Sequence, residues 1–238
     1  MSNPSTYDLI EASREPGCPI CRLEQRHVQR YLEHQFYENV NDVDFRHSLR
    51  QSLGFCREHA WQIVDERLGD VLGIAILHHD LIGTVLERLG KADPLLGKED
   101  SGRKKRLPEQ AGDLVQRTLY AITAHKRCPA CHQRDMVEAS LVSSLMENIG
   151  NSEIQAALHL SEGLCLPHLR ACLKLAKGTT SGEALLNIQR QKMEALQQEL
   201  GELIRKNDYR FAREALGTEK DSWLRAVGMV VGRVIRKK

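Results

Sequence analysis

The sequence is poor in aromatic residues, has no long apolar run and carries almost no net charge. Aromatic residues make up 5% of the 238 residues, while Leu, Ala, Glu, Arg and Gln are abundant, which favours helices over sheet. No stretch of about 18 apolar residues occurs, so we expect no transmembrane span. The formal net charge of +2 provides no overall field for nucleic acid or for an acidic membrane.

The N-terminus also lacks the pattern of a signal peptide, a basic segment followed by an apolar run. Seven cysteines are nevertheless present. Without an export signal, this number of cysteines indicates a reducing compartment, where clustered thiols bind metal or undergo redox chemistry. We therefore expect a cytoplasmic protein.

Six of these cysteines belong to a motif that occurs twice. The first copy reads CPIC at 18–21 and GFCREH at 54–59, and the second reads CPAC at 128–131 and GLCLPH at 163–168. Equivalent cysteines and histidines are 109 or 110 positions apart, which indicates that one unit has been duplicated. Each copy offers three thiols and one imidazole, the ligand set of a closed tetrahedral zinc site.

The spacing of the motifs predicts one metal site in each copy. Each copy thus contains a CxxC motif and a CxxH motif, called the CxxC clip (or CPxC clip) and the CxxH clip below. Between the two clips lie 34 residues in the first copy and 33 in the second, a length that suits a helical hairpin whose two ends meet. Each predicted site joins the two clips of one copy. The first is expected to use Cys18, Cys21, Cys56 and His59, and the second Cys128, Cys131, Cys165 and His168.

Two structural zinc ions are the expected cofactors, each supplying on the order of 10 kcal/mol towards folding. The proline after the first cysteine of each CPxC clip suits the first turn of a helix, so both clips are expected to begin helices. An iron–sulfur cluster is the alternative cofactor, because the ligand types alone do not exclude it.

Apolar residues at helical spacing indicate an all-α protein with two homologous helical halves. The first half covers residues 1–90, and the second covers residues 113–238, including a long helix at 181–206 and a tail helix that begins near Asp221. Residues 91–112 are charged and punctuated by Pro and Gly, and are predicted to form a linker. Other helices are expected at 22–40, after the capping residues Asn41 and Asp42, at 71–89 and at 113–125.

The duplicated clips and two C-terminal motifs, Asp208-Tyr-Arg-Phe211 and Asp221-Ser-Trp-Leu-Arg-Ala226, resemble a family of bacterial and archaeal proteins of unknown function. The similarity covers nearly the whole chain apart from residues 91–112. The resemblance implies a helical protein with metal clips at the eight positions named above, and it implies no reaction. Tyr209, Phe211 and Trp223 are expected to dock the tail onto the second half or to contact a partner.

No catalytic constellation accompanies the metal ligands. The sequence contains no Ser/His/Asp order, no Gly-rich phosphate loop and no HExxH motif, and four strong protein ligands leave no position for a reactive water. We therefore expect that the protein is not an enzyme. Cys172, one helical turn beyond His168, is expected to be a small buried residue rather than a spare ligand.

The function that this pattern favours is a zinc-binding helical adaptor or regulatory module whose partner is another protein. The long helix at 181–206 also suits pairing in a homodimer. An iron–sulfur electron carrier or a metal-delivery protein is the first alternative. Nucleic-acid binding through Arg103–Arg106 and the C-terminal basic residues is a weaker one, since the net charge opposes it. Contact of the basic, amphipathic last helix with a membrane surface is also disfavoured.

Overall fold

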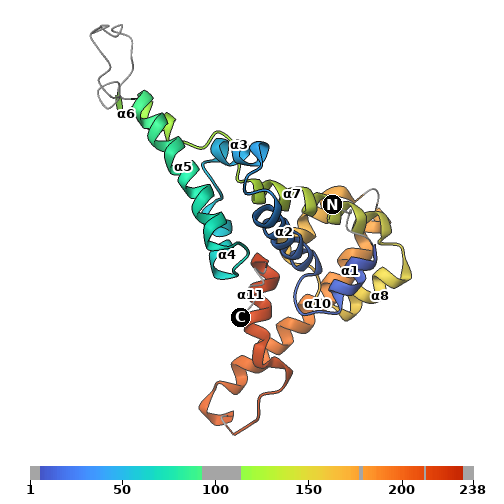
Figure 1. Cartoon of the computed structure of the whole chain (residues 1–238). Helices are drawn as coiled ribbons and strands as arrows, with labels where there is room; N and C mark the ends of the chain where they lie inside the picture. The colour runs from blue at the N-terminus through green and yellow to red at the C-terminus, as the bar shows by residue number, and fades with distance from the viewer. Residues whose placement is uncertain (1–5, 93–113, 177–178, 212, 233–238) are drawn as a thin grey trace, which may run out of the picture. The chain divides into compact units, whose positions relative to one another are not determined.

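The computed structural model describes residues 6–92, 114–176, 179–211 and 213–232 (Figure 1). Over these ranges the protein is all-α, as its composition predicted, and contains no strand. No helix in this part of the chain has the length and apolar character needed to cross a membrane. The predicted linker lies outside the described residues, apart from Lys91 and Ala92, and so do the basic runs at 103–106 and 236–238.

The helices form two similar series followed by a tail. The first series is α1 (Thr6–Ser13), α2 (Pro19–Glu38), α3 (Val43–Ser52), α4 (Arg57–Asp65) and α5 (Val71–Ala92). The second series is α6 (Leu114–Ala121), α7 (Pro129–Asn148), α8 (Ser152–Leu160), α9 (Leu166–Leu175) and α10 (Thr179–Lys206). The tail contains two short 3-10 helices, η1 (Tyr209–Phe211) and η2 (Thr218–Asp221), and then α11 (Ser222–Val231). The duplication therefore spans five helices in each copy.

Equivalent capping residues begin the short third helix of each series. The side chain of Asp42 accepts a hydrogen bond of 2.7 Å from the backbone N–H of Phe45 at the start of α3. Asn151, 109 positions later, accepts one of 2.7 Å from the N–H of Glu153 at the start of α8. Both caps satisfy a backbone donor that has no partner within its helix, so the repeated sequence produces the same local structure twice.

Two predicted helix ends were wrong. α5 continues through Gly90 to Ala92, because a glycine inside a helix costs only about 1 kcal/mol relative to alanine and need not end it. α6 stops at Ala121 rather than at His125. Beyond that point the backbone N–H groups of His125 and Lys126 donate to the carbonyl oxygen of Gln51, at 2.9 and 3.2 Å, which draws the chain out of the helix.

The chain folds into two compact units whose boundaries fall inside α2 and α7. The first unit contains residues 1–27 and 134–238, and the second contains residues 28–133. Each unit thus combines the opening of one sequence copy with the remainder of the other. The units therefore differ from the halves expected from the repeat, 1–90 and 113–238.

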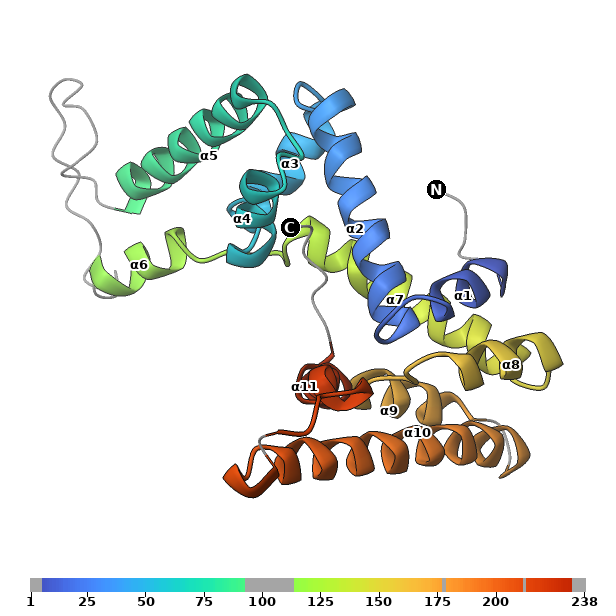
Figure 2. The ribbon, with the colours of Figure 1, turned by 90° about the horizontal axis from the view of Figure 1, so that it is seen from below.

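In the first unit, α11 lies against α9 and α10, and α1 lies against α8 (Figure 2). Its buried core is built largely from leucine and isoleucine on the second series of helices and in the loop before α9. The most deeply buried of these side chains are Leu141, Leu145, Ile154, Leu164 and Leu185. Cys18, Cys21 and Cys165 belong to the same buried cluster, so ligand side chains are part of the core of this unit.

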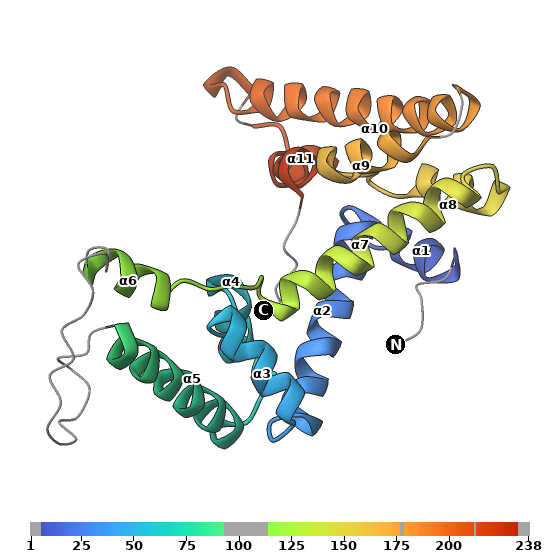
Figure 3. The ribbon, with the colours of Figure 1, turned by 90° about the horizontal axis from the view of Figure 1, so that it is seen from above.

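In the second unit, α5 lies beside α6 and α3 (Figure 3). Its core contains Leu32, Phe36, Leu49, Ile63 and Leu77, together with Cys128. Here too a cysteine of the CPxC motif belongs to the buried apolar cluster. The two units are therefore alike in placing cysteine side chains where the core meets a helix N-terminus.

Candidate metal centres

The eight predicted ligands gather into two groups of four, and each group takes its members from both sequence copies. In either group the ligand atoms all lie within 4.8 Å of one another. The first centre consists of Cys18, Cys21, Cys165 and His168, and the second of Cys56, His59, Cys128 and Cys131. The predicted pairing of the two clips within one copy was therefore wrong, because each CPxC clip meets the CxxH clip of the other copy.

Unequal helix lengths explain this exchange. α2 has 20 residues and rises about 30 Å, whereas the returning helix α3 has 10 residues and rises about 15 Å. The chain therefore covers only about half of the return path before it reaches Cys56. The second copy is built in the same way, with 20 residues in α7 and 9 in α8. The hairpin predicted from the sequence would need two arms of equal length to bring the two clips of one copy together.

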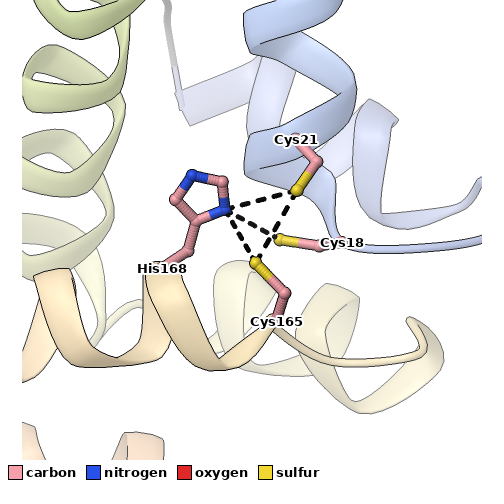
Figure 4. A group of neighbouring side chains, drawn as sticks. All are labelled: Cys18, Cys21, Cys165 and His168. Carbon is pink, nitrogen blue, oxygen red and sulfur yellow. Dashed lines mark hydrogen bonds between the residues drawn. The ribbon is translucent and has the colours of Figure 1, made fainter. Parts of the chain in front are cut away.

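The first centre has the geometry of a tetrahedral site (Figure 4). Nδ1 of His168 lies 3.4 Å from the sulfurs of Cys18 and Cys21 and 3.1 Å from that of Cys165. The sulfurs of Cys21 and Cys165 are 3.7 Å apart. A zinc ion with ordinary bond lengths requires edges of about 3.8 Å between sulfurs and about 3.6 Å between sulfur and nitrogen. The four side chains thus surround a space of the right size for one ion.

The second centre repeats these dimensions. Nδ1 of His59 lies 3.2, 3.4 and 3.7 Å from the sulfurs of Cys56, Cys131 and Cys128. The sulfurs of Cys56 and Cys131 are 3.6 Å apart. Both centres therefore offer three sulfurs and an imidazole Nδ1 at the corners of a tetrahedron of a size that fits zinc.

All four clips lie at the start of a helix. Pro19 and Pro129 are the first residues of α2 and α7, as predicted. Cys56 and Cys165 are the N-cap residues of α4 and α9. A zinc ion with three thiolates and a neutral imidazole would carry a net charge of −1, which the positive ends of two helices would stabilise at each centre.

A glycine turn precedes each CxxH clip and sets the direction in which the chain enters it. Gly54 and Gly163, each two residues before the cysteine of its clip, have φ of 94° and 87°. Side chains with a Cβ rarely adopt this backbone conformation, so the repeated glycine has a direct structural reason.

Electrostatics in the first centre favour a cation. Burial, reinforced by the neighbouring sulfurs of Cys165 and Cys21, raises the pKa of the Cys18 thiol well above its usual value. Burial acts to lower the pKa of His168, but its bonds to Cys165, Cys21 and Glu24 outweigh this and raise the pKa to about 12. Several buried thiolates exist together only beside a positive charge. A divalent metal ion would supply that charge.

Two carboxylates behind His168 were not predicted from the sequence. Nε2 of His168 lies 3.3 Å from Oε1 of Glu24 and 3.8 Å from Oε1 of Glu138. Since Nδ1 faces the sulfurs, the Nε2–H group points to these acceptors, which orients the ring for metal binding. Burial and the nearby charge of Glu24 raise the pKa of Glu138. The two glutamates lie on α2 and α7, and no local pattern links either of them to the motif.

Gln189 supports the loop that carries Cys165, and it too was missed. Its side chain is 2% exposed. Its Oε1 accepts from the backbone N–H of Leu164 at 2.8 Å, and its Nε2 donates to the carbonyl of the same residue at 2.9 Å. These two side-chain bonds satisfy the backbone N–H and carbonyl of Leu164, which would otherwise need backbone partners in this buried loop. In the sequence, the only indication of this role was a glutamine at a position within the apolar stripe of α10.

The end of α11 covers the first centre. Gly232 has φ 83° and ψ 167°, a conformation that is essentially restricted to glycine. A Cβ at this position would lie 3.4 Å from the sulfur of Cys21 and 3.6 Å from that of Cys165. The tail backbone therefore lies directly against two ligand sulfurs.

Several polar contacts hold the tail. Nζ of Lys206 lies 2.7 Å from Oε1 of the buried Glu219. Arg225 pairs with Glu199 and donates to the carbonyl of Thr218 at 2.8 Å.

Of the aromatic residues predicted to dock the tail, Phe211 lies under the guanidinium of Arg205, with 4.4 Å from Cζ to the ring centroid. Tyr209 is 87% exposed and Trp223 is 58% exposed, which leaves these two rings open to a partner. Cys172 is fully buried on α9, as expected.

Comparison with known proteins places these features in a family. Residues 6–237 match the model described as "Family of unknown function (DUF6062)". The chain belongs to this family. The match confirms the resemblance inferred from the repeated clips and the C-terminal motifs.

A relative from Caldicellulosiruptor sp. (strain Rt8B.4), described as "Uncharacterized 23.9 kDa protein in xynA 3'region", is 26% identical over 226 residues. The aligned region covers 94% of this chain and 99% of the relative. No solved structure matches the chain. The family match therefore establishes a relationship between the proteins and gives no activity.

Proposed function

We propose that the protein is a zinc-binding helical adaptor without catalytic activity of its own, which holds one zinc ion in each centre and binds another protein. The observation that carries this proposal is the pair of closed Cys3His groups. Four strong protein ligands complete the coordination of zinc and leave no position for a reactive water. A reducing compartment would keep the six ligand thiols available, and we place the protein in the cytoplasm on this ground.

The compactness of the ligand groups favours zinc over an iron–sulfur cluster. Cysteines that hold a cluster bind different iron atoms and are spread around it. In both centres all four ligand atoms lie within 4.8 Å of one another, which suits a single ion. An iron–sulfur carrier is accordingly the less favoured function.

A groove formed by α9, α10 and α11 is the surface that best suits a protein partner. Its volume is about 510 Å³, and its apolar lining includes Leu169, Leu186, Met193, Leu200 and Val230. Apolar side chains in a groove between helices suit the apolar face of a partner helix. The groove is built on the elements that follow directly after the CxxH clip of the first centre, so zinc binding would support its shape.

The metal is tested on protein purified without added metal under anaerobic conditions. We expect two zinc ions per chain by elemental analysis, in a colourless protein, together with a light-scattering mass that reports whether it is a monomer or a homodimer. A brown protein that contains iron and sulfide would contradict the zinc proposal and favour electron transfer. A protein with no bound metal would contradict both.

The adaptor role is tested by partner capture from the native cell with a matched pair of variants. Val230→Glu places a charge in the groove, at a side chain that is 56% exposed, and should abolish recovery of the partner. Leu160→Glu changes an exposed apolar residue of α8 that does not line the groove and should leave recovery unchanged. Recovery of no reproducible partner by the wild-type protein would count against the proposal, as would equal recovery by both variants.

A further inference from the structure

We propose that the second centre is an oxidation site, at which Cys56 and Cys131 form a disulfide and release the zinc ion, while the first centre retains its own. This inference rests on the zinc content proposed above. It assigns different roles to two centres that have the same ligands. The first would hold the fold permanently, and the second would respond to oxidants.

The sulfur geometry alone does not separate the centres. The sulfurs of Cys56 and Cys131 are 3.6 Å apart, and those of Cys21 and Cys165 are 3.7 Å apart. A disulfide bond of about 2.0 Å requires a similar approach in either pair. Any difference in reactivity must therefore come from access and from the surroundings of each centre.

Access differs between the two pairs. All four ligands of the first centre are buried, and the backbone at Gly232 lies against the sulfurs of Cys21 and Cys165. In the second centre, His59 and Cys128 are buried, but Cys56 and Cys131 are partly exposed. The sulfurs of these two partly exposed ligands are also close, at 3.6 Å, so an oxidant that reaches one finds the second within range. Thiolate character and exposure together determine which cysteines are oxidised.

The surroundings of the ligands differ as well. Glu24 and Glu138 stand behind His168 in the first centre. The duplication places Arg134 where Glu24 would recur and Val28 where Glu138 would stand in the first copy. The positions equivalent to Glu24 and Glu138 in the other copy are therefore not carboxylates. Such acceptors raise the affinity for the metal, so they support retention of an ion at the first centre.

The step balances with a hydroperoxide such as hydrogen peroxide as the oxidant. The thiolate of Cys131 or Cys56 attacks one peroxide oxygen, the O–O bond breaks, and a sulfenic acid and hydroxide result. The second thiolate then attacks the sulfenic sulfur, which forms the S–S bond and expels a second hydroxide. The two sulfurs together lose two electrons, which reduce the two peroxide oxygens. His59 and Cys128 alone hold zinc weakly, so the ion dissociates.

The test uses the full-length, zinc-loaded protein and hydrogen peroxide, with released zinc followed by a chromogenic chelator. We expect one of the two ions to be released in a fast phase and the other in a separate, slow phase, because the partly exposed thiolates of the second centre are oxidised first. At the end of the fast phase, alkylation and peptide mapping should find Cys56 joined to Cys131, with Cys18, Cys21 and Cys165 still thiols. A thiol reductant and zinc should restore the starting protein.

Three outcomes would overturn the inference: simultaneous release of both ions, earlier release from the first centre, or no release. None of them depends on partner binding, and the starting zinc content is measured independently, so the adaptor proposal is judged separately. Cys172→Ser serves as a control, because Cys172 is a buried cysteine outside both ligand groups and its loss should leave the two phases unchanged. Gly232→Ala should increase the rate of the slow phase selectively, because the new Cβ disfavours the backbone conformation that covers the first centre.

Discussion

The sulfurs of Cys21 and Cys165 lie 3.7 Å apart although the two residues are 144 positions apart in the chain. This contact joins the CPxC clip of the first sequence copy to the CxxH clip of the second, and the reciprocal contact joins Cys56 to Cys131. The duplicated unit therefore does not close on itself. Each copy is completed by the other, so both copies are needed to form either centre.

Cys56→Ser should therefore expose cysteines of the second copy rather than those nearest to it in the first. Loss of one thiolate from the second centre should release its zinc ion and make Cys128 and Cys131 reactive. We expect N-ethylmaleimide to modify these two at native pH while Cys18 and Cys21 remain protected in the first centre. Mass spectrometry of the labelled peptides, together with a zinc content reduced from two ions to one, measures the effect.

The pairing within one copy makes the opposite prediction for the same variant. If Cys56 shared an ion with Cys18 and Cys21, these two residues would become reactive and Cys128 would stay protected. Cys172→Ser, which removes a buried cysteine outside both ligand groups, should keep two ions and the wild-type labelling pattern.

The ligand residues could be predicted from the sequence, but their partners could not. Three thiols and an imidazole repeated at nearly constant offset are typical of metal sites, and Pro19 and Pro129 correctly predicted the helix starts. The partnership depends instead on how far the chain returns after α2. That distance follows from the turn between Glu38 and Val43 and from the short length of α3, and nothing in the motifs encodes it.

The residues that support the ligands were hidden for a different reason. Glu24 and Glu138 are ordinary helix residues until two distant helices bring them to one imidazole. Gln189 occupies a buried position among apolar side chains, and its role becomes clear only when the carbonyl and N–H of Leu164 face it. Such roles follow from tertiary contacts rather than from a local pattern.

Glu24→Gln should weaken zinc binding at the first centre by about tenfold. The amide oxygen of Gln still accepts a bond from Nε2–H of His168, but it lacks the charge that makes the bond to a carboxylate stronger. Competition with a chelator of known affinity measures this change. Cysteine labelling at each chelator concentration shows which of the two centres has lost its ion. Glu33→Gln, an exposed change on the same helix, should leave both affinities unaltered. An equal effect of both variants would show that the change is not specific to the contact with His168.

Gln189→Leu should destabilise the protein by about 1–3 kcal/mol, because it leaves a buried backbone N–H and a carbonyl of Leu164 without partners. The side chains are similar in size, so a cavity contributes little. Chemical unfolding of the zinc-loaded protein measures the loss, and Gln191→Leu, an exposed position two residues away, is the control. The variant should also lose zinc from the first centre before the second, since the affected loop carries Cys165. An unchanged unfolding midpoint would contradict the supporting role of Gln189.

Acid should release the tail through protonation of Glu219. The bond to Lys206, and then that to the backbone of Gly217, lower the pKa of this carboxyl to about 2, from an unfolded value of about 4.3. Because the folded pKa is the lower one, the stabilisation is complete above the unfolded value and declines as the pH falls towards the folded value. Glu219→Gln should remove this dependence, since the amide does not titrate.

Hydrogen exchange of the α11 amides, compared between wild type and Glu219→Gln at each pH, isolates this contribution. Near neutral pH the variant should exchange faster, and the two proteins should converge as the pH falls through about 4 towards 2. Acid should also release zinc, so the zinc content of both proteins is measured at each pH and the comparison is made at equal content. Glu194→Gln, an exposed change on α10, should match the wild type throughout. If the two proteins exchanged alike near neutral pH, the pair of Lys206 and Glu219 would not hold the tail, and the cover over Cys21 and Cys165 would depend on the apolar contacts of α11 instead.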